Sequence, residues 1–181
     1  MPIIRGKEAL QEIYASAAEK RWVVPTFCAE NQTTIEAVLG ACQRKAEELG
    51  QRIPITLGLT IRYDHRPQAL HYSTTRNWRT GLDLFLSDCA ILARPDGDFP
   101  DVDVMTHLDH GQPIDDQELL ESDDVTRFSS VMFDASAFPW EENLARTKEF
   151  VARRGHELYI EGAEDEIIDA GGESHAELTT P

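Results

Sequence analysis

Stretches with the composition of buried strands alternate with stretches that have the periodicity of amphipathic helices. The strand patterns lie at 22–27, 53–59, 102–111, 128–134 and 157–160. Such alternation requires a parallel sheet joined by right-handed crossovers. A complete (β/α)8 barrel needs about 250 residues. Because the chain has 181 residues, we expect one α/β domain over 1–181, an incomplete TIM (β/α)8-type barrel of about five βα units.

Helix patterns fill the intervals between the expected strands. They cover 7–20, 33–49, 78–92, 113–122 and 139–154. The second is expected to begin at Thr33-Thr-Ile-Glu36, which has the spacing of a capping box, and to stop at Gly50. The helical period is lost between Thr60 and Asn77, a connection long enough to be functional or partly helical.

This connection also contains the one cluster of basic residues in an acidic chain. Its basic residues are Arg62, His65, Arg66, His71 and Arg76. A local positive patch could attract a small anionic substrate. The alternative is a solvated surface or a contact with a partner chain.

Charge and composition exclude several classes of function. A net charge of −16 argues against binding of nucleic acid, because nothing would neutralise the phosphates. No apolar run approaches the length of a membrane span, and the N-terminus lacks the apolar core of a signal peptide. Cys28, Cys42 and Cys89 have neither paired nor metal-like spacing. We therefore expect no membrane partner and a location in the reducing cytoplasm.

The end of the strand 102–111 carries the densest group of ionisable residues. His107, Asp109 and His110 precede Gly111, which is expected to let the backbone turn. Alternation along a strand places His107 and Asp109 on one face and His110 with Leu108 on the other. Such groups at the carboxyl end of a buried strand are typical of barrel active sites. An imidazole could hold a metal or substrate while the carboxylate transfers a proton. The alternative is a buried, hydrogen-bonded histidine beside an incidental aspartate.

Asp134 ends the next strand in the same way that Asp109 ends this one. The carboxyl ends of parallel strands meet at one edge of a sheet. Both aspartates are therefore expected at the same edge.

Several motifs in this order resemble the class II (metal-dependent) ketose-bisphosphate aldolases. They are His107-Leu-Asp-His-Gly111, Phe128-Ser-Ser-Val-Met-Phe-Asp-Ala-Ser136 and Glu141-Glu-Asn-Leu-Ala-Arg-Thr-Lys148. Val24-Pro-Thr-Phe27 is similar to the family's first strand, and Gly171-Gly-Glu173 to Leu178-Thr-Thr-Pro181 to its mobile catalytic loop. The resemblance covers most of the chain, as if the barrel were truncated after its fifth strand.

The resemblance implies a zinc-dependent lyase of carbohydrate metabolism, acting in glycolysis, that reversibly cleaves a phosphorylated ketose such as fructose 1,6-bisphosphate into two trioses. His110 matches a zinc ligand, and Asp134 matches a carboxylate near the metal. Asp109 would transfer the proton of the hydroxyl at the bond being cleaved, and Glu173 matches the base that removes the neighbouring carbon-bound proton. His107 and Glu161 would then lie next to the metal ligands and orient them without binding the metal.

The chain departs from the family pattern at several places. The family's other two zinc-binding histidines and its glycine-rich phosphate loops lie on later strands. Glu161-Gly-Ala163 stands where the family has two glutamates flanking one residue, and Cys28 stands in place of an asparagine. The histidines that could substitute as ligands are His65, His71, His107, His156 and His175.

Three functions follow from these observations. The first is an aldolase whose site is completed by further chain or by another subunit, with a phosphorylated sugar as substrate. The second is a catalytically inactive aldolase-like scaffold or partner subunit. The third is a different lyase that uses Asp109, His107 and His110. The open barrel edge predicts a homo-oligomer or another chain that covers it.

Overall fold

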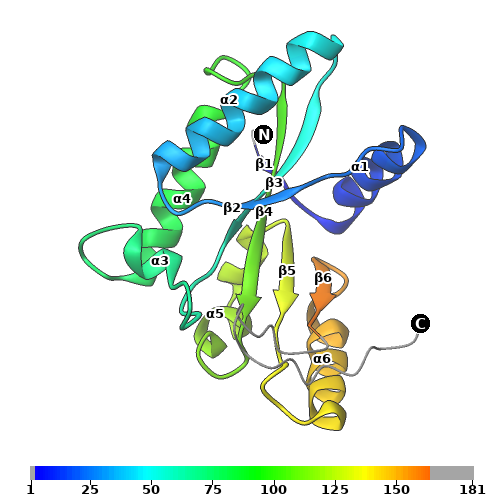
Figure 1. The fold of residues 1–181 in the computed structure, drawn as a ribbon. Helices are drawn as coiled ribbons and strands as arrows, with labels where there is room; N and C mark the ends of the chain where they lie inside the picture. Colours follow the sequence, from blue (N-terminus) through cyan, green and yellow to red (C-terminus); the bar gives the residue numbers. More distant parts are fainter. Residues whose placement is uncertain (1–2, 164–181) are drawn as a thin grey trace, which may run out of the picture.

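The computed structural model describes residues 3–163, which form a curved parallel sheet flanked by helices (Figure 1). The strands are β1 (Ile3–Ile4), β2 (Thr26–Cys28), β3 (Ile53–Leu59), β4 (Val102–Gly111), β5 (Ser130–Phe133) and β6 (Tyr159–Gly162). Their order is β2-β3-β4-β5-β6, and every pairing is parallel. The expected α/β sheet of barrel type is therefore confirmed.

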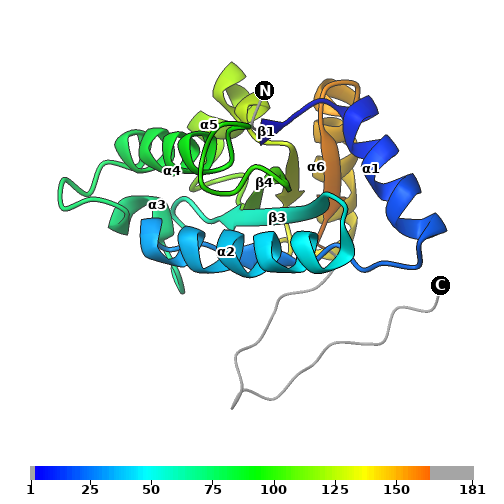
Figure 2. The same ribbon diagram turned by 90° about the horizontal axis from the view of Figure 1, so that it is seen from above.

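Helices connect successive strands. They are α1 (Lys7–Glu19), α2 (Gln32–Leu49), α3 (Gln68–His71), α4 (Trp78–Leu92), α5 (Gln117–Glu121) and α6 (Trp140–Arg154), with the 3-10 helix η1 (Asp123–Arg127) before β5. Figure 2 shows the sheet from above, with α2 against β3, β4 and α4 and with α6 on the side of β6. No helix within residues 3–163 is both long and apolar enough to cross a membrane.

The main hydrophobic core lies between the outer face of the sheet and these helices. Leu57, Val104 and Leu108 are fully buried on that face, and Phe85 of α4 is equally buried. Phe133 of β5 stacks on Phe150 of α6 with ring centroids 4.5 Å apart. Burial of side chains of this size contributes roughly 1.5–3 kcal/mol each, so this interface fixes the positions of the strand ends.

The inner face of the sheet is polar by comparison. One row of paired residues runs Cys28, Gly58, His107, Ser130 and Tyr159 across β2 to β6. Tyr14 of α1 packs edge-on against Tyr159 at 5.2 Å, so α1 reaches this face. The inner face of a barrel is where strand residues form layers, and here the layer carries titratable groups.

Three local expectations need correction. Helix α2 begins at Gln32 rather than at a capping box on Thr33, because Asn31 is the N-cap and its Oδ1 accepts from the Thr34 amide at 3.0 Å. Strand β2 begins only at Thr26, after Pro25, which has no amide to donate. The pattern also missed β1, whose two residues pair with Val104 and Met105 of β4. A two-residue strand has no detectable period.

Candidate functional site

The carboxyl end of β4 contains a β-bulge that decides where its side chains point. Leu108 pairs with Val131 and Gly111 with Phe133, so three steps along β4 match two along β5. His110 takes up the extra residue with a left-handed φ of 51°. Its Nε2 consequently lies 4.0 Å from Oδ1 of Asp109. The expectation that His110 shares a face with Leu108 is therefore wrong.

The turn expected at Gly111 occurs one residue earlier, at His110. Gly111 is the last residue of β4 and is required for a different reason. A Cβ atom there would lie 2.9 Å from Leu108 Cδ2 and 3.2 Å from Leu120 Cδ2. The glycine thus permits close packing between the bulge and α5.

His110 is held on two sides. Its Nδ1 lies 2.6 Å from Oδ2 of Asp134 at the carboxyl end of β5. The ring of Tyr63 stacks on the imidazole with centroids 4.3 Å apart and planes 5° apart. The hydrogen bond to Asp134 raises the pKa of His110, burial opposes this rise, and the charge of Asp109 adds to it. The imidazole therefore presents Nε2 toward Asp109.

Asp134 is itself fixed by two donors. Its Oδ1 accepts hydrogen bonds from the amide and the hydroxyl of Ser136, at 3.1 and 2.6 Å. Burial would raise the pKa of Asp134, but the hydrogen bonds from His110 and Ser136 outweigh it and lower the pKa. The carboxylate therefore stays ionised and orients the imidazole.

Asp109 receives a hydrogen bond from β2, two strands away in the sheet. The thiol of Cys28, at the end of β2, donates to Oδ2 of Asp109 at 3.1 Å. Burial, followed by the hydrogen bond and charge of Asp109, raises the pKa of Cys28 to about 12, while Arg66 acts in the opposite direction. The thiol thus remains protonated and acts as a donor.

His107 lies one layer below Asp109. It is 7% exposed, and its Nδ1 lies 2.8 Å from the Ser130 hydroxyl. Burial lowers its pKa, with Asp109 opposing and His110 adding to the effect. His107 lines an inner cavity of about 300 Å³ together with Thr56, Ser130 and Glu161. His107 is therefore a buried, hydrogen-bonded histidine, as in the alternative interpretation of this strand end.

The structure thus brings Asp109, His110 and Asp134 together, with His107 and Glu161 beside the inner cavity. The charge of Glu161 also contributes to the raised pKa of His110, which places that carboxylate near the site. Glu173 lies outside the described residues. The sequence did not indicate Tyr63 as a site residue, because Tyr63 lies in a connection that has neither helical nor strand periodicity.

The basic connection contributes less than its composition suggested. Arg62 donates to the Asp115 carbonyl at 2.8 Å and lies 3.6 Å from Glu118. Arg66 lies 3.7 Å from Glu30 and near the Cys28 thiol. Of these two arginines, Arg66 is the one that reaches the candidate site.

The described residues do not form a complete site for the zinc ion expected from the resemblance. Within 3–163 there is no cluster of three or more His, Cys, Asp or Glu side chains able to hold a metal ion. Nδ1 of His110 is already engaged with Asp134. A catalytic zinc normally has three protein ligands, so residues 3–163 do not by themselves fit it.

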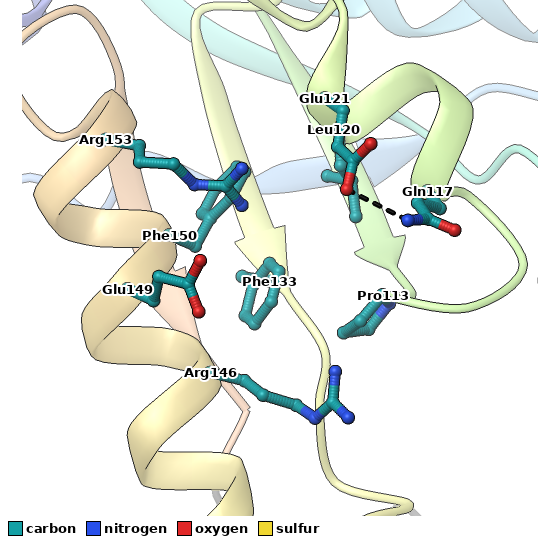
Figure 3. A pocket seen from close by; sticks show the side chains of 9 residues that line it. All are labelled: Pro113, Gln117, Leu120, Glu121, Phe133, Arg146, Glu149, Phe150 and Arg153. Carbon is teal, nitrogen blue, oxygen red and sulfur yellow. Dashed lines mark hydrogen bonds between the residues drawn. The ribbon is translucent and has the colours of Figure 1, made fainter.

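A separate pocket lies on the outer side of the sheet, between α5 and α6 (Figure 3). It measures about 150 Å³, and Phe133, Arg146 and Glu149 are among its lining residues. Arg146 is paired with Glu142 at 2.7 Å. The residues of the predicted site do not line this pocket, which is therefore not part of it.

Fold and site together define a partial (β/α)8 barrel with ionisable side chains at the carboxyl ends of its strands, where barrels place their functional residues. Residues 8–167 match the family model described as "Fructose-bisphosphate aldolase class-II". The chain belongs to the class II fructose-bisphosphate aldolase family.

Individual relatives agree with this assignment. The chain is 24% identical over 168 residues to a fructose-bisphosphate aldolase of Treponema pallidum, covering 87% of this chain and 44% of the relative. It is 29% identical over 180 residues to a sulfofructosephosphate aldolase of Alkalicoccus urumqiensis, covering 95% and 49%. The chain therefore spans about half the length of these curated relatives.

A solved structure shows the same fold. The fructose-bisphosphate aldolase of Campylobacter jejuni superposes with a TM-score of 0.63 at 20% identity, covering 88% of this chain and 48% of that one. At this identity the match establishes the fold alone.

Proposed function

We propose that this chain supplies the proton-transferring part of a zinc-dependent aldolase site that reversibly cleaves a phosphorylated ketose, such as fructose 1,6-bisphosphate, into two trioses. The proposal extends family membership to an activity. The observation that carries it is the convergence of Asp109 and His110, with Oδ1 and Nε2 4.0 Å apart and Nδ1 held by Asp134. A carboxylate beside an oriented imidazole can move a proton at a bound hydroxyl.

In the cleavage direction, Asp109 would accept the proton of the hydroxyl next to the breaking carbon–carbon bond. The oxygen of that hydroxyl becomes the carbonyl of the released aldehyde. The electron pair of the broken bond passes to the ketone fragment, which becomes an enediolate. Glu173, by family resemblance, would then return a proton to its carbon and give the second triose. Asp109 reprotonates the aldehyde oxygen in the synthetic direction.

Dependence on zinc is a property of the family. In this proposal the other ligands of the zinc ion come from outside residues 3–163. Among residues 3–163, His110 has a ring nitrogen, Nε2, that could bind the zinc, because its Nδ1 is engaged with Asp134. The ligands would be supplied by further chain or by another subunit.

Zinc content and cleavage can be measured on the same 181-residue chain. About one zinc per chain after removal of loosely bound metal, with zinc-dependent release of glyceraldehyde 3-phosphate from fructose 1,6-bisphosphate, would support the proposal. His110→Ala should lose both. Asp96→Asn, which alters an exposed carboxylate in a turn, is the matched control and should lose neither. Absence of zinc and of cleavage would contradict an active aldolase site in the 181-residue chain, either alone or as a homo-oligomer.

A catalytically inactive aldolase-like partner subunit is the second candidate. It is favoured by the absence of a metal cluster within 3–163 and by two sheet edges, β2 and β6, that no other described strand covers. An apolar groove of about 470 Å³ runs between β2 and α2, with Phe27 46% exposed in it. Apolar surface beside an open edge favours pairing with another chain, so a homo-oligomer or mixed assembly is part of either proposal. Light scattering combined with zinc content distinguishes the two, because an inactive subunit assembles without zinc.

A cytoplasmic location is also part of the proposal. Cys28, Cys42 and Cys89 are all free thiols in the structure, as expected in a reducing compartment.

A further inference from the structure

Cys28 and Asp109 meet although they come from strands that are not neighbours. The Cys28 thiol lies 3.1 Å from Oδ2 of Asp109, on the inner side of the sheet, and β3 separates the two strands. Contact across an intervening strand needs a gap in the side chains of that strand. The residue of β3 that lies between them is therefore expected to be small.

Gly58 provides this gap. It pairs with Cys28 on one side and with His107 on the other. A Cβ atom at Gly58 would lie at ordinary van der Waals distance from both side chains, 3.6 Å from the Cys28 sulfur and 3.8 Å from Asp109 Cβ, so the glycine lies next to both partners of the hydrogen bond. The side chains of Cys28 on β2 and Asp109 on β4 thus meet beside the glycine of β3.

The contact leaves the two carboxylate oxygens of Asp109 with different surroundings. Oδ2 accepts from the thiol, while Oδ1 faces Nε2 of His110 at 4.0 Å. The side chain of Asp109 is 19% exposed, so substrate can reach it. A donor on Oδ2 restricts rotation of the carboxylate and keeps Oδ1 toward the site.

We propose that Cys28 is a positioning residue, whose thiol holds Oδ2 of Asp109 and thereby turns Oδ1 toward His110 and the reacting hydroxyl. The contact itself is independent of the proposed function. Its catalytic consequence rests on that function, because it requires Asp109 to transfer a proton.

The charged groups around the thiol make the contact measurable without any activity. Asp109 suppresses formation of the Cys28 thiolate and Arg66 promotes it. Thiolate is the form that reacts with iodoacetamide, so the alkylation rate reports on both neighbours. Cys42 lies half-buried on α2 and serves as an internal reference within every sample.

Alkylation is followed by peptide mass spectrometry at about pH 8.5, on the full chain. Asp109→Asn should alkylate at Cys28 about tenfold faster than the native chain, since it removes the opposing charge. Arg66→Gln should alkylate more slowly, while the Cys42 rate stays constant in both. Equal Cys28 rates in the native chain and Asp109→Asn would overturn the contact and with it the proposal.

The catalytic consequence is tested by replacing the thiol. Cys28→Ser keeps a donor and should retain kcat within about twofold, whereas Cys28→Ala should lower kcat about five- to tenfold with KM unchanged. An unchanged kcat in Cys28→Ala would overturn the positioning role. Absence of cleavage from the native chain would overturn the proposed function, and the alkylation rates then decide the inference about Cys28.

Discussion

His110 Nδ1 and Asp134 Oδ2 lie 2.6 Å apart, which joins the bulged end of β4 to the end of β5. The side chains are 12% and 4% exposed, so this is a partly buried contact between two elements. Paired groups at this depth are coupled to stability as well as to chemistry. Asparagine at 134 would have a single acceptor oxygen and could not accept from both His110 and Ser136, so one of these donors would lose its hydrogen bond.

Asp134→Asn should therefore lower the free energy of unfolding by about 2 kcal/mol near pH 5.5. The raised pKa of His110 gives stability that is complete below the ordinary value of 6.5 and is lost as pH rises through the folded value. The lowered pKa of Asp134 gives stability that is present above 3.8 and is lost as pH falls through the folded value. The cost of the substitution should thus be largest between these limits.

Urea unfolding at several pH values measures this cost. Ser136→Ala removes a single donor from the same carboxylate and serves as the comparison, with an expected cost of about 1 kcal/mol. A cost for Asp134→Asn that is the same at about pH 9 as at pH 5.5 would contradict an ionic pair.

Gly111→Ala should destabilise the protein by about 1–3 kcal/mol, because its Cβ would lie 2.9 Å from Leu108 Cδ2. Gly40→Ala is the matched control, since its Cβ meets Phe99 at an ordinary 3.6 Å within α2. That substitution should stabilise by about 0.5–1 kcal/mol, as expected for alanine in a helix. Thermal unfolding of the two variants should therefore shift in opposite directions, and a shift in the same direction would contradict the packing described at the bulge.

Tyr63 stacked on His110 predicts a ring-current effect. The imidazole CH protons of His110 should resonate at unusually high field in the native chain, because they lie over an aromatic face at 4.3 Å. Tyr63→Leu should move them to ordinary positions, and Tyr63→Phe should leave them in place. Two-dimensional NMR of the histidine rings tests this, and unchanged shifts in Tyr63→Leu would refute the stacking.

Asp116 should make the free energy of unfolding depend on pH with the opposite sign to Asp134. It is 1% exposed, and burial raises its pKa from 3.8 to about 6. The folded state then holds a proton that the unfolded state has released, so this group makes stability fall as pH rises from about 4 through 6. Asp116→Asn should remove that fall and raise stability at pH 7.5 by about 2 kcal/mol.

Urea unfolding from about pH 4 to 7.5 provides the test, with Asp96→Asn as the exposed control. The native chain and the control should lose stability in parallel over this range. An equal loss in Asp116→Asn would show that another group is responsible.

Much of the fold could be predicted because the strands have a distinctive apolar composition. The apolar runs at β3 and β4 and the glycine that ends α2 at Gly50 are local signals, and the structure agrees with them. The start of α2 was less readable, because Asn31 and Thr33 both satisfy the rules for a cap. Strand β1 was unreadable, since its place beside β4 depends on a tertiary contact.

For the candidate site, the placement of Asp109 and Asp134 at one edge of the sheet could be predicted, but the geometry around them could not. Asp109 and Asp134 follow from the rule that barrel sites lie at the carboxyl ends of strands. The bulge at His110 could not be read from the chain, because it is a mismatch between two strands that are distant in sequence. Tyr63 could not be read either, since its stacking depends on how an aperiodic connection folds back. Cys28 did have a signal, because it ends its strand as Asp109 does.

The most direct test of the central claim separates cleavage from proton exchange in one variant. Native chain supplied with zinc should cleave fructose 1,6-bisphosphate and exchange the α-proton of dihydroxyacetone phosphate with deuterated water. Asp109→Asn should lose cleavage by at least about a hundredfold while exchange continues, because Asp109 acts on the hydroxyl and not on the carbon-bound proton. Cleavage by Asp109→Asn at the native rate would contradict the role assigned to Asp109.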